Sequence, residues 1–334
     1  MRDAVTLKDI DAVSALALAQ NRRRFLADSR MPCPKVEEIT RYLTQESPGD
    51  LVWAAQRAGA EPNGVAVPVV IEYPADSDAL AYWPQRNGTT AAVYVSGRSE
   101  AECRAALYCL LQKLDAYWRS ATPEGVSFMW PSQDFEAAGI LSKFGIQLDA
   151  FFATRDASSR PLTHTNPPNL KIRPALPRDL SSLIRLADEV VAAHIPHSPF
   201  ARPTVSIGDR YRERLNAQWK NRTLNGSRPV SFVAELDAQV VAIADCLIIE
   251  EGSSVGSLVR HGKYLYVNSF AVAECLRGTG IGAALADHVH GKVLEERCCG
   301  SYLWFSAYNR GASNFWRKAG YVPLWTSFQR RCES

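Results

Sequence analysis

The fold is decided by residues 268–285, which read NSFAVAECLRGTGIGAAL. The residues NSFAV end a run of strand-forming residues that starts at Tyr264, and residues 281–294 carry apolar side chains at helical spacing. Between them lies RGTGIG, residues 277–282, whose glycines permit turns and a close approach of a ligand to the backbone. Amides at the start of a helix lack partners, and the helix dipole makes that end positive. The loop therefore predicts a diphosphate site, with Arg277 as an additional cation.

Glycine-rich loops also bind dinucleotides, so the position of this loop in its domain matters. The strand, loop and helix come late, after a predicted hairpin, and no strand–helix–strand unit follows them. The acidic residue that binds the ribose in a dinucleotide fold has no natural place here. The sequence thus favours another diphosphate ligand, and a structural turn with accidental glycines is the remaining alternative.

The second half of the chain combines predicted strands with helices, which indicates a mixed α/β fold. Strands are expected at residues 170–173, 230–236, 240–249, 264–272, 302–306 and 321–328, and helices at 180–191, 281–294 and 312–318. Asp179 can cap the first helix, and Asp237-Ala238-Gln239 can form the tight turn of a hairpin.

A polar segment with three prolines, residues 158–169, predicts a linker between a domain of residues 1–157 and one of residues 170–334. The first half repeats the second in weaker form. Residues 128–146 align with residues 303–321 at one constant offset. Asp134 then falls on Asn309, Lys143 on Lys318 and Gly145 on Gly320, and Arg2-Asp3-Ala4 mirrors residues 173–175. A repeat of this length suggests a duplicated domain.

The second half resembles the Gcn5-related N-acetyltransferase (GNAT) family in two motifs, about thirty residues apart. The first is residues 268–285, quoted above. The second is Asn309 followed by Ala312, the aromatic pair Phe315-Trp316 and Gly320-Tyr321. The resemblance covers residues 170–330 well and residues 1–157 in outline. It implies two tandem GNAT-like domains, each a twisted mixed β-sheet flanked by helices, in which two strands splay apart to admit an acyl-CoA. Tandem copies with one working half occur in this family.

The resemblance also implies which residues bind the co-substrate, acetyl-CoA or another acyl-CoA. The backbone around Phe270, Ala271 and Val272 would bind the pantetheine arm, and the amide near Val272 would polarise the thioester carbonyl. Asn309 would touch the pantetheine arm, with Phe315 packing nearby, although a core position explains Phe315 equally well. The pyrophosphate would lie on Arg277, Gly278, Thr279, Gly280, Ile281, Gly282 and Ala283.

Catalytic groups are harder to assign, because the usual family pattern is incomplete. Family members often use a carboxylate on the strand before the loop as the base and a tyrosine in the later helix as the acid. Here the strand offers Tyr266 and Asn268, and the helix offers Trp316. Tyr308 and Tyr302 are near in sequence but out of register. The candidates are therefore Asn268, Tyr266 and Tyr308.

Three explanations of the missing base stay open. Another residue can supply it, for which Asp245, Glu250, Glu251 and His261 flank the site in sequence. Asn268 can orient a chain of water molecules. The third explanation is an acceptor of low pKa that needs little help.

The first half departs further from the family pattern. Its predicted strand at residues 91–95 leads into Ser96-Gly97-Arg98-Ser99, which has no Gly-x-Gly, and then into a helix that begins with Glu100 and Glu102. Those charges suit a helix dipole but repel a diphosphate. We expect this half to be non-catalytic, to buttress the other half, and to help wall the acceptor pocket, since ligand sites favour domain interfaces.

Composition limits the function further. A net charge of +3 over 334 residues gives no argument for a nucleic-acid partner, and no apolar run is long enough for a membrane span. Without a signal sequence or CxxC pair the eight cysteines indicate reduced thiols and a cytoplasmic protein.

The leading hypothesis is an acyl-CoA-dependent N-acetyltransferase that acts on a small-molecule amine by direct attack in a ternary complex. It needs no metal, and it would be a monomer or homodimer. The alternatives are an acyltransferase or decarboxylase acting on carrier-protein-bound acyl chains in specialised metabolism, and a non-catalytic acyl-CoA sensor.

Overall fold

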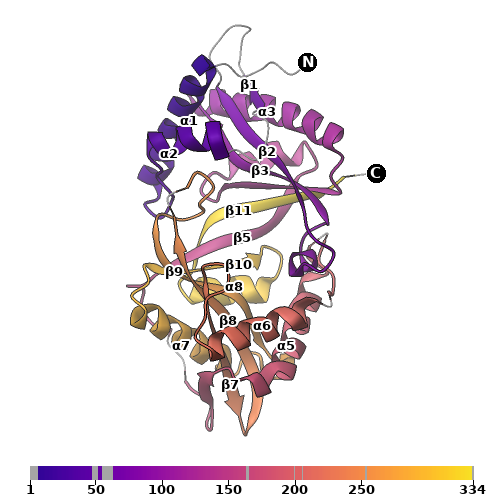
Figure 1. The fold of residues 1–334 in the computed structure, drawn as a ribbon, viewed down its shortest axis with the longest axis vertical. Helices are drawn as coiled ribbons and strands as arrows, with labels where there is room; N and C mark the ends of the chain where they lie inside the picture. The colour runs from indigo at the N-terminus through magenta and orange to yellow at the C-terminus, as the bar shows by residue number, and fades with distance from the viewer. Residues whose placement is uncertain are drawn as a thin grey trace.

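The computed structural model describes residues 7–46, 52–54, 63–162, 165–198, 200–204, 206–252 and 254–332 (Figure 1). The first half has the elements α1 (Leu7–Ala27), α2 (Val36–Arg41), β1 (Val52–Ala54), β2 (Gly64–Glu72), β3 (Arg86–Val95), α3 (Glu100–Ala121), β4 (Gly125–Pro131), α4 (Glu136–Ser142) and β5 (Gln147–Asp156). The second half has β6 (Lys171–Pro174), α5 (Leu180–His194), α6 (Ser206–Trp219), β7 (Arg228–Leu236), β8 (Gln239–Glu251), β9 (Gly262–Val272), α7 (Ile281–Glu295), β10 (Gly300–Ser306), α8 (Arg310–Lys318) and β11 (Val322–Arg331). Four shorter helical segments are η1 (Tyr42–Glu46), η2 (Asp78–Ala81), η3 (Pro177–Asp179) and η4 (Glu274–Leu276).

Several of these elements start or turn where local chemistry directs them. The hairpin between β7 and β8 turns at Asp237 and Ala238, both with positive φ, as a two-residue hairpin turn requires. Helix α3 starts after Ser99, whose hydroxyl accepts a hydrogen bond from the Glu102 amide. Asp179, the predicted cap of α5, instead uses its carboxylate to bind Arg173 and the Leu176 amide.

The strands of the described residues form one sheet of eleven, in the order β1-β2-β3-β4-β11-β5-β10-β9-β8-β7-β6. Each half has the expected twisted mixed sheet with helices, but the two sheets are continuous. They join because each half places its last strand beside the other half. Strand β11 lies between β4 and β5, and β5 lies between β11 and β10, so that both cross the middle of the molecule (Figure 1).

The predicted repeat is confirmed by these strands. Strand β4 begins at residue 125 and β10 at residue 300, β5 begins at residue 147 and β11 at residue 322, and both differences are 175. The same offset relates the ends of these strands, and it carries the pairing of β4 with β11 onto that of β10 with β5. Gly145 and Gly320, equivalent under this offset, both adopt left-handed backbone, with φ of 71° and 85°. The proposed match of residues 2–4 lies outside the described residues.

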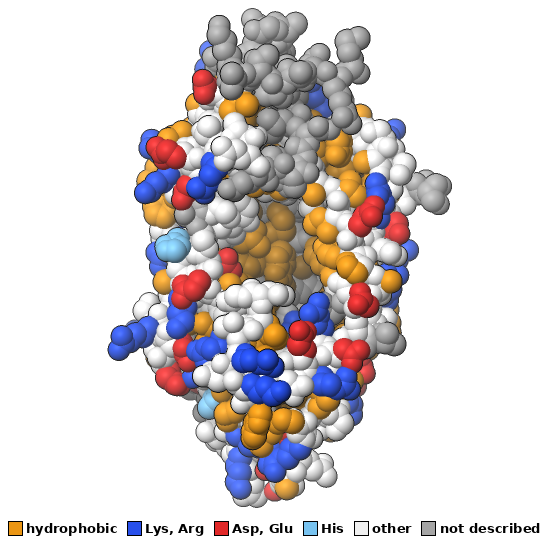
Figure 2. Space-filling model, viewed as in Figure 1, with side chains coloured by type: hydrophobic (Ala, Val, Ile, Leu, Met, Phe, Trp, Pro, Cys, Tyr) orange, Lys and Arg blue, Asp and Glu red, His pale blue; other side chains and the backbone are white. Residues whose placement is uncertain are grey.

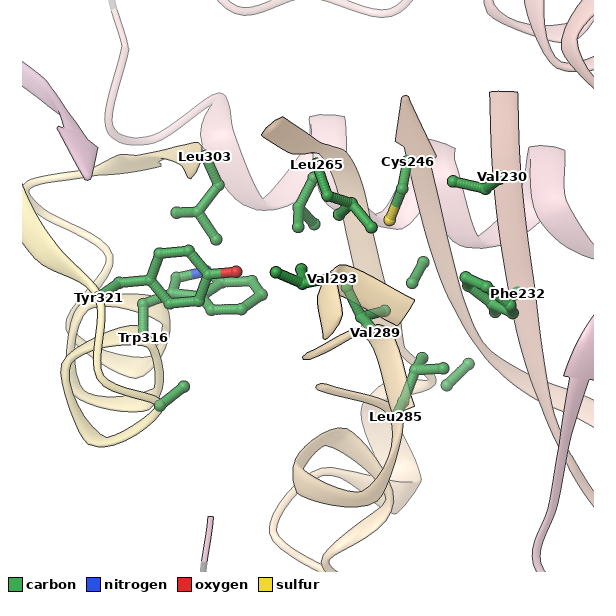
Figure 3. Close-up of a cluster of buried hydrophobic side chains, with 14 of the residues drawn as sticks. Val230, Phe232, Cys246, Leu265, Leu285, Val289, Val293, Leu303, Trp316 and Tyr321 are labelled. Carbon is green, nitrogen blue, oxygen red and sulfur yellow. The ribbon is translucent and has the colours of Figure 1, made fainter. Parts of the chain in front are cut away.

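The helices cover both faces of the sheet. Helices α3, α4, α7 and α8 pack on one face, and α1, α2, α5 and α6 pack on the other. Figure 3 shows the core under α7, where Leu285, Val289 and Val293 face strand residues such as Leu265 and Phe232. This core fixes the helix whose first turn follows the glycine-rich loop.

No helix within the described ranges has the length and apolar character needed to cross a membrane. The domain boundaries themselves stay a prediction. Residues 157–170 do connect β5 to β6, but β11, within the predicted second domain, pairs with two strands of the first.

The exchange of last strands predicts that the halves depend on each other for folding. Expressed separately, residues 1–157 and 158–334 are each expected to lack a cooperative thermal transition, because β4 and β10 each lose a neighbour. Coexpression is expected to yield a soluble 1:1 complex, measured by gel filtration and circular dichroism. A single half that unfolds cooperatively as a monomer would contradict the expectation.

Candidate active site

The glycine-rich loop connects β9 to α7. Gly278 and Gly280 have φ of 82° and 93°, a conformation that residues with a Cβ rarely adopt. Helix α7 starts directly after Gly280, which offers no side-chain cap to the amides of the first turn. Arg277 is exposed, and its Nε donates to the Val272 carbonyl at 3.2 Å. The structure thus brings an arginine, left-handed glycines and uncapped amides to one place.

The segment between the halves lies against this loop. The Leu162 amide donates to Asp287 on α7 at 2.9 Å. A Cβ built on Gly280 would lie 2.8 Å from the Thr165 carbonyl oxygen, whereas one on Gly282 would meet Val272 and Phe315 at ordinary contact distances. A substitution at Gly280 would therefore disturb the chain beside it as well as any ligand.

Strands β9 and β10 separate at the site. Their parallel pairing runs from Tyr264↔Gly300 to Val267↔Leu303, whereas β9 continues to Val272 and β10 to Ser306. Among the described residues, β9 therefore has no strand partner on the β10 side beyond residue 267, in the segment where the resemblance implied a role for Phe270, Ala271 and Val272. This end of pairing between β9 and β10 is called the opening below, and from it β9 continues to the glycine-rich loop.

Asn268 is a bulge residue at the start of this opening. Opposite β8, the pairing jumps from Ser269↔Asp245 to Val267↔Cys246 and skips Asn268. Its Nδ2 donates to Asp245 Oδ2 at 2.9 Å. Because a carboxylate only accepts, this contact fixes the amide, and the carbonyl oxygen of Asn268 is left to face away from Asp245.

Asp245 is fully buried and belongs to a polar network between α6 and the strands β7, β8 and β9. Arg214 on α6 donates to its Oδ2 at 2.6 Å, and the Ser231 hydroxyl donates to its Oδ1 at 2.7 Å. Tyr211, also on α6, bonds Ser269, and burial together with the nearby Asp245 carboxylate raises the pKa of this phenol. Asp245 is therefore an ion-paired residue that orients Asn268.

The later motif lies beside the opening. Phe315 packs on Phe270, with ring centroids 5.6 Å apart, and on Trp316 at 4.8 Å. Trp316 is buried in the core, so it has no role as an acid. Asn309 is the N-cap of α8, where its Oδ1 accepts from the Ala312 amide at 3.0 Å. The ligand roles of Asn309 and Phe315 stay predictions.

The tyrosine candidates occupy different environments. Tyr266 stacks on Tyr302 with centroids 5.1 Å apart, on the opposite face of the sheet from α7. Tyr308 is half-exposed after the end of β10. Tyr302, off-register in sequence, is buried; burial and its hydrogen bond to Glu251 at 2.5 Å raise its pKa, so it stays protonated.

The flanking acid and histidine candidates are less suited to catalysis. Glu250 is exposed, and Glu251 accepts from Tyr302. His261 is exposed, and its Nδ1 contacts the Glu251 carbonyl at 2.8 Å. The structure therefore brings Asn268 and Asp245 together and leaves the others at the periphery.

Figure 2 shows a hollow in the face between α1 and α5–α6, with hydrophobic side chains on its floor. In the same view, Figure 1 shows β11 and β5 at that place. Central strands contribute an aromatic cluster to this face, which includes Phe152, Tyr264, Tyr302 and Trp325. The hollow therefore lies over the junction of the two halves.

Asp149 is a residue that sequence reasoning missed. It lies on β5 at a bulge, because the pairing with β11 jumps from Ala150↔Ser327 to Leu148↔Phe328. The residue is 8% exposed. Burial raises the pKa of its carboxyl to about 6, and a hydrogen bond with Ser198 opposes that shift. Nothing in the local sequence, QLDAF, marks this aspartate.

The first half repeats the opening but fills it. Strand β3 pairs with β4 only at Asn87↔Gly125 and Gly88↔Val126, and a bulge at Ala91 stands where the second half has Asn268. Arg24 of α1 donates to the Val93 carbonyl at 3.0 Å.

The guanidinium of Arg24 lies 5.5–5.8 Å from the ring centroids of Tyr94, Trp130 and Trp325. These rings come from β3, β4 and β11, so the cation occupies the gap between the strands, where cation–π contacts stabilise it. Burial lowers its pKa to about 10, which leaves it charged at neutral pH. The filled gap supports the prediction that this half binds no CoA.

Over the ranges that the structure describes, no group of three or more His, Cys, Asp or Glu side chains could hold a metal ion.

Comparisons with known proteins agree with this geometry. The sequence model of the Acetyltransferase (GNAT) family matches residues 196–321, which include the loop and the later motif. Among solved structures, a GCN5-related N-acetyltransferase from Sphaerobacter thermophilus is similar, with a TM-score of 0.58 and 16% identity, over 97% of this chain and 93% of that chain. At that identity the likeness concerns the fold alone.

A tandem GNAT protein from the clavulanic acid biosynthesis pathway matches 98% of this chain and 96% of its own, with 12% identity and a TM-score of 0.47, too low to support an argument. A search of curated protein sequences finds no significant match.

The polar network around Asp245 predicts that two arginines of α6 contribute very differently to stability. Arg214→Leu leaves Asp245 as an unpaired buried charge and is expected to lower the free energy of unfolding by about 3–5 kcal/mol. Arg212→Leu, on the exposed side of the same helix, is expected to change it by less than about 1 kcal/mol. Urea denaturation measures the free energy of unfolding of both variants. Equal decreases in the two variants would show that the Arg214–Asp245 pair does not stabilise the fold more than an exposed ion pair does.

Asp149 predicts a pH-dependent stability. Its folded pKa of about 6 lies above the ordinary value of 3.8 for an aspartate, so the folded state binds the extra proton and stability falls as pH rises from about 4 through 6. Asp149→Asn removes this loss and is expected to be more stable than the wild type at pH 7, by up to about 3 kcal/mol. Asp156→Asn, exposed on the same strand, is the control. Parallel pH–stability curves for the wild type and Asp149→Asn would refute the expectation.

Proposed function

The C-terminal half of this chain belongs to the GNAT superfamily of acyltransferases, and on that premise we propose that the protein is an acyl-CoA-dependent N-acyltransferase. It transfers an acetyl group from acetyl-CoA to the amine of a small molecule. The observation that carries the proposal is the separation of β9 from β10 after Val267↔Leu303, in line with the loop at residues 277–282.

Acetyl-CoA, the proposed donor, would lie along β9 in one orientation. The diphosphate binds the loop amides and Arg277, where the helix dipole and the guanidinium both favour negative charge. The pantetheine arm adds to the free edge of β9 like a strand, with Phe270 and Phe315 beside it. The thioester then reaches the bulge at Asn268.

The reaction is a direct displacement in a ternary complex. The neutral amine attacks the thioester carbonyl, the C–N bond forms, and the C–S bond breaks as CoA leaves as a thiol. A backbone amide on the β10 side of β9, next to the bulge at Asn268, stabilises the charge that develops on the carbonyl oxygen. The carbonyl oxygen of Asn268, oriented by Asp245, accepts a hydrogen bond from the amine or from a water that carries its proton away.

A charge reversal in the loop tests the donor site. Arg277→Glu places a carboxylate beside the diphosphate and is expected to weaken CoA binding at least about tenfold, measured by calorimetry. The residue is exposed, so the fold is expected to be unchanged. The matched control is Arg98→Glu, also exposed, in the corresponding loop of the first half, with no expected change in CoA affinity.

A thiol-release assay with acetyl-CoA and a panel of primary amines tests the transfer. Release of CoA with formation of the N-acetyl product supports the proposal. Tight CoA binding without turnover on any amine would instead indicate an acyl-CoA sensor, and turnover only with a carrier-protein thioester would indicate the carrier-protein alternative. An affinity unchanged by Arg277→Glu would place the donor elsewhere.

A further inference from the structure

Asp149 differs from the other buried carboxylates that the structure describes. Asp245 is paired with Arg214, and Asp179 is paired with Arg173. Asp149 has only the hydroxyl of Ser198, and no arginine, lysine or histidine among the described residues pairs with it. A carboxylate removed from water without a cation is costly, so its retention needs a reason.

The strand that carries Asp149 lies next to the catalytic half. Strand β5 pairs with β10 up to Ala150↔Ser306, and the Ala307 amide donates to the Asp149 carbonyl at 3.0 Å. Strand β10 in turn forms one side of the opening for the donor. Asp149 therefore belongs to the first half in sequence and to the surroundings of the second half's site in space.

A segment of the second half completes these surroundings. Ser198 follows α5, and the chain then docks on the first half. Phe200 lies so close to Gly125 on β4 that a Cβ there would meet its ring at 2.3 Å, and Arg202 donates to the Leu80 carbonyl at 3.1 Å. The surroundings of Asp149 are thus built by both halves, and β5, the strand that carries it, crosses the molecule at the place of the hydrophobic hollow (Figures 1 and 2).

We propose that Asp149, supplied by the non-catalytic half, binds the ammonium group of the acceptor in the hollow between the halves. This inference rests on the proposed N-acyltransferase function and names its substrate class: a primary amine attached to an apolar or aromatic body. The hydrophobic floor takes the body, and the buried carboxylate supplies the single countercharge.

The ion pair between Asp149 and the ammonium group also favours the reaction. A bound alkylammonium removes the cost of the isolated charge, because the two ions neutralise each other away from water. Before attack the ammonium gives one proton to Asp149 or to water, and the neutral amine then forms the C–N bond. The degenerate half contributes an acceptor group even though its own opening is filled by Arg24.

Binding of two simple probes tests the proposal without turnover. Benzylammonium and its uncharged counterpart benzyl alcohol are titrated into the full-length protein at pH 8 and followed by ligand-observed NMR. The wild type is expected to bind benzylammonium about tenfold or more tightly, the difference that a hydrogen bond to a charged group provides. Asp149→Asn, of nearly the same shape, is expected to lose this preference.

The matched control is Asp156→Asn, on the exposed end of the same strand, which is expected to keep the preference. A wild type that binds both probes equally, or an Asp149→Asn variant that still prefers the ammonium, would overturn the proposal. In the acetylation assay, Asp149→Asn is expected to raise KM for the amine and to leave KM for acetyl-CoA unchanged. A rise in both KM values would indicate a merely structural role.

Failure of the proposed function has a different signature. A wild type that neither binds CoA nor releases thiol from acetyl-CoA would refute the acyltransferase, whatever the two probes do. Loss of the ammonium preference in Asp149→Asn would still identify a cation site in that case. Normal CoA binding and turnover with an unchanged preference would refute only the role of Asp149.

Discussion

The antiparallel pairing of β5 with β11 is the constraint on which the rest of the molecule depends. These two strands join the sheets of both halves, and each is followed on its other side by a strand of the opposite half. The pairing places β10, which forms one side of the opening proposed for the donor. The same two strands lie under the hollow proposed for the acceptor, so both proposed sites depend on strands from the two halves.

Most of the elements and the donor loop follow from local sequence. Apolar periodicity, the turn at Asp237 and Ala238, and the glycines of residues 277–282 are short-range signals, and the structure agrees with them. The exchange of last strands could not be read in this way, because alternating side chains prescribe two faces of a strand but not its neighbour. The repeat could be recognised in the sequence because residues 128–146 align with residues 303–321 at one offset. That alignment does not show which strands pair, so the pairing of β4 with β11 and of β5 with β10 appears only in the structure.

The site likewise contains residues that the local sequence predicts and residues whose role depends on tertiary contacts. The glycine-rich loop can be recognised from its own residues. The orientation of Asn268, in contrast, depends on Asp245 of the neighbouring strand and on Arg214 of a helix distant in sequence. Asp149 is one acidic residue in an ordinary strand, and its burial depends on a segment of the other half. The two halves have diverged at one equivalent bulge, where one keeps Asn268 and the other has Ala91 beside a gap occupied by an arginine.

The exchanged strand also bears on how the chain is made. A ribosome delivers β4 long before β11, and nearly two hundred residues emerge between them. Throughout that interval the growing first half exposes a bare strand edge to any other nascent chain. Its tertiary structure is completed only when residues 322–331 have left the exit tunnel and can pair with β4, so the two halves acquire their native state together.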